Sequence, residues 1–363
     1  MRVRTFVVDD EQLARNRLKQ LLSALEDVDV VGEAADGDEA VRGIHNLRPD
    51  LVLLDIQMPG RSGLEIAASL APPRPNIVFC TAFDQYAMRA FELHAVDYLL
   101  KPVSRDRLAQ TVDQIRQKLS ENREIVRDLQ NAQVVQERLF PQVLPAMDTL
   151  DYAGACRPAR SVGGDYFDFL PIAPGKLGIA LADVSGKGVA AALLMASLQG
   201  RLQSQARAYA DDPAGLLSEL NRDIWRTTEG ARYITMFYGV YDDGTRAFSY
   251  VNAGHNPPLV RGRTNRQLDR GGTVLGCFES IALEREVVTL AAGDTLILFS
   301  DGITEARNAR DEEFGEARLA SLVESAGSGT AAQLRDRLLE QVEAFGGGIA
   351  AHDDRTVVVA RVH

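Results

Sequence analysis

The sequence predicts a doubly wound α/β domain, a long connecting helix and a layered α+β domain, in that order. In residues 1–119, short apolar runs alternate with helical stretches. In residues 104–140, an apolar repeat continues without Gly or Pro. After residue 146, strands and helices come in groups instead of alternating. The 363 residues are enough for two or three such domains.

The composition is that of a globular protein, with 45% hydrophobic and 25% charged residues. A net charge of −11 argues against a nucleic-acid-binding protein, which would normally carry a basic face. We find neither a signal peptide nor the roughly 18 consecutive apolar residues of a membrane helix. The three cysteines have no CxxC spacing, which favours a reducing compartment. We therefore expect a cytoplasmic protein without nucleic-acid or membrane partners.

The first domain, residues 1–119, is expected to hold five parallel strands buried on both faces. Asp9 and Asp10 follow the first of these strands, and Asp55 follows the third. Ligands of a doubly wound sheet bind beyond such strand ends, and clustered carboxylates repel one another without a cation, so Mg(II) is implied. Asp55 would then be the nucleophile toward a phosphoryl donor, with Lys101 neutralising phosphoryl oxygens. The expected strands are Val3–Val8, Val28–Gly32, Leu51–Leu54, Ile77–Cys80 and Val96–Leu99.

These residues resemble the receiver domain of two-component response regulators. The resemblance rests on Val-Val-Asp-Asp-Glu, Leu-Asp-Ile-Gln-Met-Pro-Gly, Thr-Ala and Asp-Tyr-Leu-Leu-Lys-Pro, which begin at residues 7, 54, 81 and 97. It implies Asp55 as the phosphoacceptor, a sensor histidine kinase as partner, and a cis peptide before Pro102. It also implies Mg(II) ligands and a switch apparatus. The implied ligands are Asp9, Asp10, Asp55 and the Gln57 carbonyl, and the implied switch residues are Thr81, Tyr98 and Lys101.

The connecting segment, residues 120–145, continues the last receiver helix. Positions spaced four and three residues apart form an apolar seam with polar flanks, and Asn122 is a polar residue within it. We expect an unbroken helix over Ser104–Phe140 and a parallel homodimeric coiled coil. The alternative is a single amphipathic helix packed on its own domain. Pro141 and Pro145 end the helix and form a rigid junction. The seam residues are Leu108, Val112, Ile115, Leu119, Asn122, Val126, Leu129, Gln133, Gln136 and Phe140.

The last segment, residues 146–363, contains mostly β-strand patterns followed or separated by grouped helices. This grouping predicts an α+β or layered sandwich instead of a second parallel sheet. The expected strands are Tyr152–Cys156, Leu177–Ala182, Thr235–Tyr241, Ala247–Val251, Val287–Leu290, Thr295–Phe299 and Thr356–Val362. The expected helices are Val189–Ala208, Pro213–Thr228, Phe314–Ser325 and Ala331–Phe345.

Four aspartates in this segment lie in turns beside apolar runs, although they are far apart in the sequence. They are Asp165, Asp183, Asp301 and Asp353. A carboxylate at an apolar strand end is costly unless a cation or hydrogen-bond donors satisfy it. Several such carboxylates fit a site that gathers hard divalent cations.

The motifs around these aspartates resemble the metal-dependent PPM serine/threonine phosphatases, in particular the RsbU/SpoIIE branch of bacterial partner-switching pathways. They are Val-Gly-Gly-Asp, Ala-Asp-Val-Ser-Gly-Lys-Gly, Asn-Ala-Gly-His-Asn-Pro-Pro, Ser-Asp-Gly-Ile-Thr-Glu and Asp-Asp-Arg-Thr, beginning at residues 162, 182, 252, 300 and 353. The resemblance implies an α-β-β-α sandwich that binds two Mn(II) or Mg(II) ions. It implies a phosphatase acting on a phosphorylated STAS-domain anti-anti-sigma protein.

The same resemblance assigns roles to single residues. Asp183 matches the metal-bridging acid and the Val184 carbonyl a backbone ligand. Asp301 and Asp353 match the acids of the second metal, and Asp165 matches the outer acid. These aspartates form the expected catalytic set. A further match is Arg160, which corresponds to a phosphate-clamping arginine of some relatives, although a solvated surface arginine fits equally well.

One departure from the family pattern leaves the general acid open. Animal members have a histidine at the position of Ser185, so Lys187 and His255 remain candidates, with a structural hydrogen-bonding role as the alternative for His255.

Two other functions compete with the phosphatase. One is a catalytically silent phosphatase fold that sequesters a partner. The other is a diguanylate cyclase, whose GGDEF signature resembles residues 163–167, where Tyr166 replaces the Glu.

Overall fold

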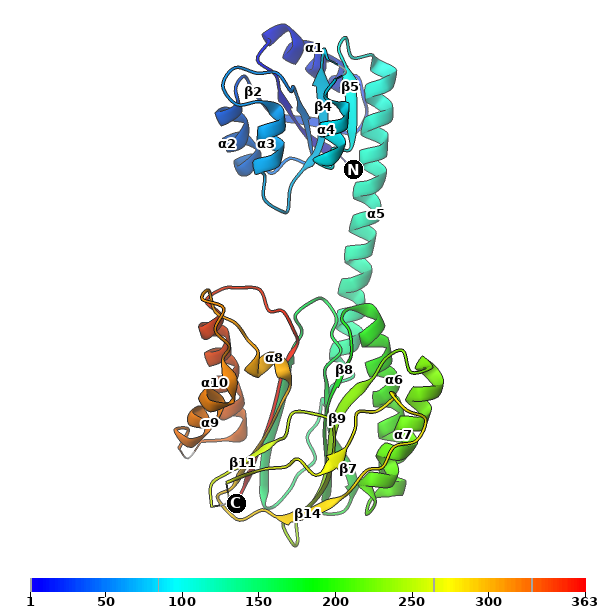
Figure 1. The fold of residues 1–363 in the computed structure, drawn as a ribbon, viewed down its shortest axis with the longest axis vertical. Coiled ribbons are helices and arrows are strands. Elements are labelled where there is room, and N and C mark those ends of the chain that lie inside the picture. Colours follow the sequence, from blue (N-terminus) through cyan, green and yellow to red (C-terminus); the bar gives the residue numbers. More distant parts are fainter. Residues whose placement is uncertain (1, 84, 264, 328) are drawn as a thin grey trace. The chain divides into compact units, whose positions relative to one another are not determined.

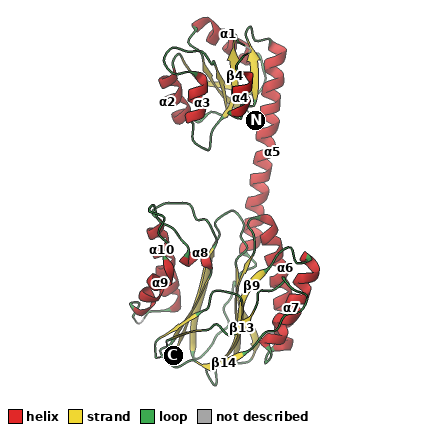
Figure 2. Ribbon diagram, viewed as in Figure 1, coloured by secondary structure: helices red, strands yellow, loops and turns green. Residues whose placement is uncertain are grey.

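The computed structural model describes residues 2–363 apart from 84, 264 and 328, and it divides into two compact units, Met1–Arg127 and Asp128–His363. Figure 1 shows both units, and Figure 2 marks their helices and strands. Among the described residues, no helix is long and apolar enough to cross a membrane.

The first unit is the expected doubly wound domain. Its five parallel strands have the order β2-β1-β3-β4-β5. Two apolar layers cover the two faces of this sheet, with Val7 and Leu53 in one layer and Phe6 and Leu54 in the other. The strands are β1 (Val3–Val8), β2 (Val28–Ala34), β3 (Leu51–Leu54), β4 (Asn76–Thr81) and β5 (Asp97–Leu100). The helices are α1 (Gln12–Ser23), α2 (Gly37–Leu47), α3 (Gly63–Ser69) and α4 (Ala87–Glu92).

Helix α5 extends over Arg105–Glu137, so it ends three residues before the expected Phe140. Its first seam residues, Leu108, Val112 and Ile115, are buried in the receiver core. This part of the seam therefore packs on its own domain, as the single-helix alternative requires. Further along, Val126 is 54% exposed, so this stretch of the seam is open to solvent.

The second unit contains two mainly antiparallel sheets. In the first sheet the strand order is β13-β10-β9-β8-β7, with β14 also paired to β10. In the second it is β12-β11-β15-β16-β6. The first sheet comprises β7 (Tyr166–Ala173), β8 (Lys176–Val184), β9 (Ile234–Asp242), β10 (Ala247–Ala253), β13 (Gly271–Gly272) and β14 (Glu286–Thr289). The second comprises β6 (Leu150–Arg157), β11 (Leu259–Arg261), β12 (Arg266–Gln267), β15 (Thr295–Phe299) and β16 (Arg355–Val362).

Three apolar layers make this unit an α-β-β-α sandwich. The middle layer, with Phe237 and Leu298, lies between the two sheets. One outer layer packs α6 (Val189–Gln205) and α7 (Pro213–Thr228) on the first sheet. The other packs α9 (Gly315–Glu324) and α10 (Ala331–Gly346) on the second sheet. Figure 1 shows these helix pairs on opposite sides of the paired sheets.

The sequence patterns missed several short or polar elements. Strand β7 begins directly after Asp165, where we expected a turn, and it places Asp168 inside the sheet. Its pattern is obscured because Asp168 interrupts the apolar run, although that carboxylate is buried and accepts hydrogen bonds from Tyr166 Oη at 2.5 Å and Gln203 Nε2 at 2.9 Å. The helix α8 (Asp301–Thr304) and strands β11, β12 and β13 were also not expected, because each is four residues or shorter.

Candidate active site

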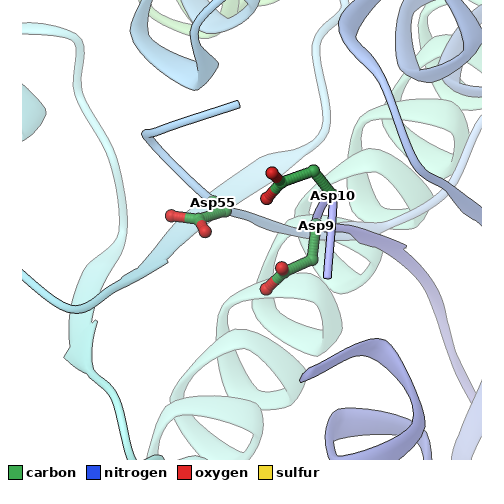
Figure 3. Close-up of side chains that lie close together, drawn as sticks. All are labelled: Asp9, Asp10 and Asp55. Atoms are coloured by element: carbon green, nitrogen blue, oxygen red, sulfur yellow. The ribbon is translucent and has the colours of Figure 1, made fainter. Parts of the chain in front are cut away.

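Three carboxylates meet at the C-terminal edge of the receiver sheet. Asp9 and Asp10 follow β1, and Asp55 follows β3, which is the neighbouring strand. One ligand oxygen from each lies within 4.8 Å of the other two, and Figure 3 shows the three side chains gathered at this point. Asp9 and Asp55 are buried, while Asp10 is exposed. Three acidic oxygens in this arrangement fit a hard cation such as Mg(II).

Lys101 provides the positive charge of this pocket. Its Nζ lies 2.7 Å from Asp9 Oδ2 and 2.7 Å from Asp55 Oδ2. Burial raises the pKa of Asp9, although the hydrogen bond from Lys101 opposes this effect. Burial also disfavours the charged form of Lys101, but hydrogen bonds to Asp55 and Asp9 outweigh it and raise the lysine pKa. The pocket can thus neutralise added negative charge at Asp55.

The remaining receiver residues surround the same edge. Thr81 ends β4, is buried, and among the described residues its Oγ1 has no hydrogen-bond partner. Tyr98 lies on β5 and its hydroxyl donates to the Phe83 carbonyl. The Gln57 amide donates to Asp55 Oδ1 at 3.3 Å, which fixes the loop after Asp55. The Lys101–Pro102 peptide bond is cis, as expected.

In the second unit, each sheet delivers two aspartates to the same end of the sandwich. Asp183 lies near the end of β8, and Asp165 directly precedes β7. The two strands are antiparallel with Tyr166 opposite Ala182, so Asp165 and Asp183 are neighbours. Asp301 follows β15 and Asp353 precedes β16, and these two strands pair through Phe299 and Val357.

The electrostatics show that these aspartates face one another. Burial, followed by repulsion from Asp301 and Asp353, raises the pKa of Asp183 to about 7. The pKa of Asp165 is raised mainly by burial and, to a smaller extent, by repulsion from Asp183. The pKa of Asp301 is raised mainly by burial and, to a smaller extent, by repulsion from Asp353. Such mutual repulsion is relieved by bound cations, so the donor set fits divalent metal ions. Among the described residues, three ligand oxygens within 4.8 Å of one another occur only at the receiver site, so the phosphatase aspartates do not form such a group.

A hydrogen-bond network fixes the loop that carries Asp165. Asp354 Oδ2 accepts from the Gly164 amide at 2.7 Å, and its Oδ1 accepts from the Ala159 amide at 2.8 Å. A Cβ atom at Gly163 would lie 2.2 Å from Asp354 Oδ2, so a larger residue there would displace the Asp354 carboxylate. Thr356 Oγ1 donates to Asp165 Oδ2 at 2.5 Å. Asp354 therefore orients the loop through its backbone, and Thr356 orients the Asp165 carboxylate.

Val184 and Arg160 lie at the same turn. A Cβ atom at Gly164 would lie 3.0 Å from the Val184 carbonyl oxygen, which places that oxygen beside the Asp165 loop. Arg160 is exposed, and its Nη1 would lie 3.9 Å from a Cβ atom at Gly188. The Arg160 guanidinium thus lies beside the turn that follows Asp183, within the neighbourhood of the acidic group.

Lys187 and a neighbouring cavity form the other side of this site. Lys187 Nζ lies 2.7 Å from Asp353 Oδ2 and donates to the His352 carbonyl at 2.5 Å. Lys187 and Asp353 also line a cavity of about 360 Å³, together with Glu305, Arg307 and Arg355. Both acidic and basic side chains therefore line this cavity, which lies next to the aspartates.

The geometry separates the candidates for the general acid. The Ser185 hydroxyl accepts a hydrogen bond from the Tyr233 amide at 2.9 Å, so it is held in a backbone pairing. His255 is buried, and its Nδ1 lies 2.8 Å from Thr235 Oγ1. Burial lowers the pKa of His255 to about 4, so the ring is neutral near pH 7 and is not an imidazolium acid. These contacts favour the structural role for His255, in a turn that Asn252 also fixes through the His255 amide at 2.7 Å.

Sequence reasoning missed the supporting roles of three residues. Thr356 and Ser300 occurred in the motifs without a role, but Ser300 Oγ accepts from the Thr356 amide at 3.0 Å and donates to the Asp354 carbonyl at 3.2 Å. Gln136 was assigned to the helical seam, but it hydrogen-bonds to Gly163. The burial of a polar residue at a seam position could not be recognised without the partner loop.

Family comparisons agree with both halves of this description. The family described as Stage II sporulation protein E (SpoIIE) matches residues 173–363, and the response regulator receiver domain matches residues 5–113. The chain belongs to the SpoIIE family. It combines a response-regulator receiver with a PPM phosphatase domain, and the diguanylate cyclase alternative has no support from these matches.

Similar curated proteins share the receiver. Transcriptional regulatory protein BtsR of Salmonella typhi is 53% identical over 119 residues, which are 32% of this chain and 50% of that protein. The Escherichia coli (strain K12) protein of the same name is 50% identical over 119 residues, with the same coverage. The chain thus spans about half the length of the curated relatives it matches.

Similar solved structures share the phosphatase fold. The RsbU and RsbW domains of Rv1364c from Mycobacterium tuberculosis are 28% identical, with a TM-score of 0.51 over 61% of this chain and 62% of that one. The SiaA-PP2C domain of Pseudomonas aeruginosa is 19% identical, with a TM-score of 0.60 over 66% of this chain and 98% of that one. At 19% identity the latter likeness concerns the fold alone.

Proposed function

We propose that this protein is a response-regulator phosphatase, which hydrolyses phosphoserine or phosphothreonine on a partner protein under control of its receiver. The observation that carries the proposal is the convergence of Asp165, Asp183, Asp301 and Asp353 from two sheets. Burial and repulsion between carboxylates raise the pKa values of the first three. Such an arrangement is stable near neutral pH when cations compensate it.

The metal ligands would be the four aspartates together with the Val184 carbonyl. Two Mn(II) or Mg(II) ions bound there would lower the pKa of a water and neutralise phosphoryl charge. In our proposal Asp165 orients the attacking water, because Thr356 fixes its carboxylate. The Arg160 guanidinium binds phosphoryl oxygens from the adjacent turn. Lys187 is the remaining charged candidate for protonating the leaving group, since Ser185 and His255 are engaged elsewhere.

A direct test uses p-nitrophenyl phosphate with Mn(II) and the full chain. We expect measurable hydrolysis by the natural sequence and a loss of at least 100-fold in kcat for Asp183→Asn. A matched control is Asp211→Asn, which changes an exposed aspartate outside the site. Equal activity of both variants would reject the assigned site, and absence of Mn(II)-dependent hydrolysis would favour the silent binding module.

The proposed protein substrate is a phosphorylated STAS-domain anti-anti-sigma protein. The proposal is supported by the resemblance of residues 146–363 to PPM phosphatases of partner-switching pathways. Incubation of a panel of phosphorylated STAS proteins with the Mn(II)-loaded enzyme would show whether one of them is dephosphorylated faster than p-nitrophenyl phosphate at equal concentration.

Control through the receiver requires phosphorylation of Asp55. The Lys101 contact to Asp55, and the Thr81 hydroxyl, which has no hydrogen-bond partner among the described residues, provide the groups that would respond to a phosphoryl group. A histidine kinase is the proposed donor. We expect acetyl phosphate to change the phosphatase rate of the natural sequence and to leave Asp55→Ala unchanged. An identical response of both proteins would exclude this route.

The proposed dimer uses only the middle of α5. Leu108, Val112 and Ile115 are buried in the receiver core, and Gln136 is buried against the phosphatase unit. The stretch between them carries exposed apolar residues, including Ile125, Val126 and Val134. A second copy of the same stretch would cover them. Light scattering of Val126→Glu should show a monomer if this seam holds the dimer, whereas an unchanged dimer would place the interface elsewhere.

A further inference from the structure

The last turn of α5 is hydrogen-bonded to the loop that carries Asp165. Gln136 Nε2 donates to the Gly163 carbonyl at 2.8 Å, and Gln136 Oε1 accepts from the Gly163 amide at 3.0 Å. One side-chain amide thus satisfies both backbone groups of one residue, as a neighbouring β-strand would. Gln136 is only 6% exposed, so water does not replace these bonds.

Only Gly164 separates this contact from Asp165. The loop is held on its other side by Asp354, whose carboxylate accepts from the Gly164 amide at 2.7 Å. Gln136 and Asp354 therefore fix consecutive residues of one short segment from two different elements. Because a peptide has only two soft dihedrals per residue, holding Gly163 and Gly164 leaves little freedom for the Asp165 backbone.

The packing around Gln136 makes these hydrogen bonds more important. Phe140 stacks on Phe167 with ring centroids 5.2 Å apart, which is a second contact with the segment around Asp165. Gln136 and Phe140 also line a cavity of about 230 Å³, together with Cys156 and Phe167. The end of the helix is therefore not fixed by dense packing alone, and loss of the Gln136 bonds would leave space for it to shift.

We propose that Gln136 is a positioning residue for the phosphatase centre, which holds Asp165 in the orientation required for metal binding. This inference rests on the proposed function, because it assumes that Asp165 serves a metal site. An apolar residue at position 136 would fill the same space but leave the Gly163 amide and carbonyl unpaired. Gln136 thus links helix α5 to Asp165 through the Gly163–Gly164 segment.

The test compares Gln136→Ala and Gln136→Glu with the matched control Gln130→Ala, an exposed glutamine on the same helix. The glutamate variant keeps the side-chain shape but cannot donate to the Gly163 carbonyl. Mn(II) affinity is measured by calorimetry without substrate. Amide hydrogen exchange of Gly163 and Gly164 is measured by NMR. Residues that orient metal ligands typically change metal affinity 10–100-fold, and we expect a loss in this range for both Gln136 variants.

Faster exchange at Gly163 and Gly164, with unchanged exchange in β8 and β16, should accompany the loss of affinity. The positioning role is rejected if the Gln136 variants bind Mn(II) as tightly as the natural sequence, or if Gln130→Ala shows the same loss. Unfolding followed by the fluorescence of the single Trp identifies a variant that fails to fold. A natural sequence that binds Mn(II) without hydrolysing phosphate esters would reject the proposed function, while the affinities still decide the role of Gln136.

Discussion

Substitution of Asp183 by Asn should change how the stability of the phosphatase unit depends on pH. Burial, then repulsion from Asp301 and Asp353, raises the pKa of Asp183 to about 7, from the ordinary 3.8. The folded state therefore binds a proton more tightly than the unfolded state. The contribution of this carboxyl to the free energy of unfolding is fully present below pH 4, and it is lost as the pH rises toward 7.

The size of this effect follows from the difference between the two pKa values. About three units correspond to about 4 kcal/mol at 25 °C, which is the upper bound for destabilisation above pH 7 without metal. Asparagine has no charge to desolvate, so Asp183→Asn should gain most of this free energy at pH 8 and little at pH 4.5. A saturating divalent ion should reverse the order, since it stabilises only the protein that retains the ligand.

The assay is urea unfolding in EDTA at pH 4.5, 6 and 8, followed by fluorescence of Trp225. This residue is the one tryptophan of the chain and lies in α7, so its signal reports the phosphatase unit. The free energy of unfolding of the natural sequence should decrease between pH 4.5 and 8 more than that of Asp183→Asn. Parallel pH curves for the two proteins would refute the view that Asp183 is a strained carboxylate.

Three further perturbations test other parts of the fold. Gly163→Ala places a Cβ atom 2.2 Å from Asp354 Oδ2. We expect the free energy of unfolding in urea to decrease by about 1–3 kcal/mol and Mn(II) binding to weaken. The control Gly200→Ala, on an open helix face, should show neither effect. Asn252→Ala removes three hydrogen bonds to buried backbone groups of His255 and Leu268, and it should lower unfolding free energy by about 3 kcal/mol; a loss below 0.5 kcal/mol would contradict this reading. Lys101→Met removes the ammonium group that contacts the Asp9 and Asp55 carboxylates. In calorimetry we expect the receiver to lose about 3 kcal/mol of stability, and Mg(II) to restore part of it. If Mg(II) has no effect on this variant, a cation site there is contradicted.

In the receiver, local sequence patterns predict both the strands and the position of the acidic residues. Its central strands β1, β3 and β4 are almost fully buried, and the edge strands β2 and β5 are mostly half-buried, yet apolar runs locate all five to within two residues. The acids that follow these runs fall on one sheet edge because of the topology. Helix α5 marks a limit of the same approach. The seam pattern predicts an apolar face but does not say what covers it, and the structure divides that face between the receiver core, solvent and the phosphatase unit.

The phosphatase unit required its tertiary structure in more respects. Strand β7 escaped detection because Asp168 interrupts its apolar run, and the partners that satisfy this carboxylate come from Tyr166 and from Gln203 on α6. The roles of Thr356 and Ser300 depend on the pairing of β15 with β16, which no local pattern contains.

The sequence alone determined the family, the two kinds of domain and the residue types of both acidic sites, because these depend on short motifs and on the periodicity of apolar residues. Only the tertiary structure decided which groups act on one another. Asp165 and Asp183 are 18 positions apart in the printed sequence, and Asp301 and Asp353 come from another sheet, so their shared burial and repulsion arise when the two sheets pack face to face. The contact of Gln136 with Gly163 arises in the same way, since hydrogen bonds between distant segments depend on packing and leave no periodic trace in the sequence.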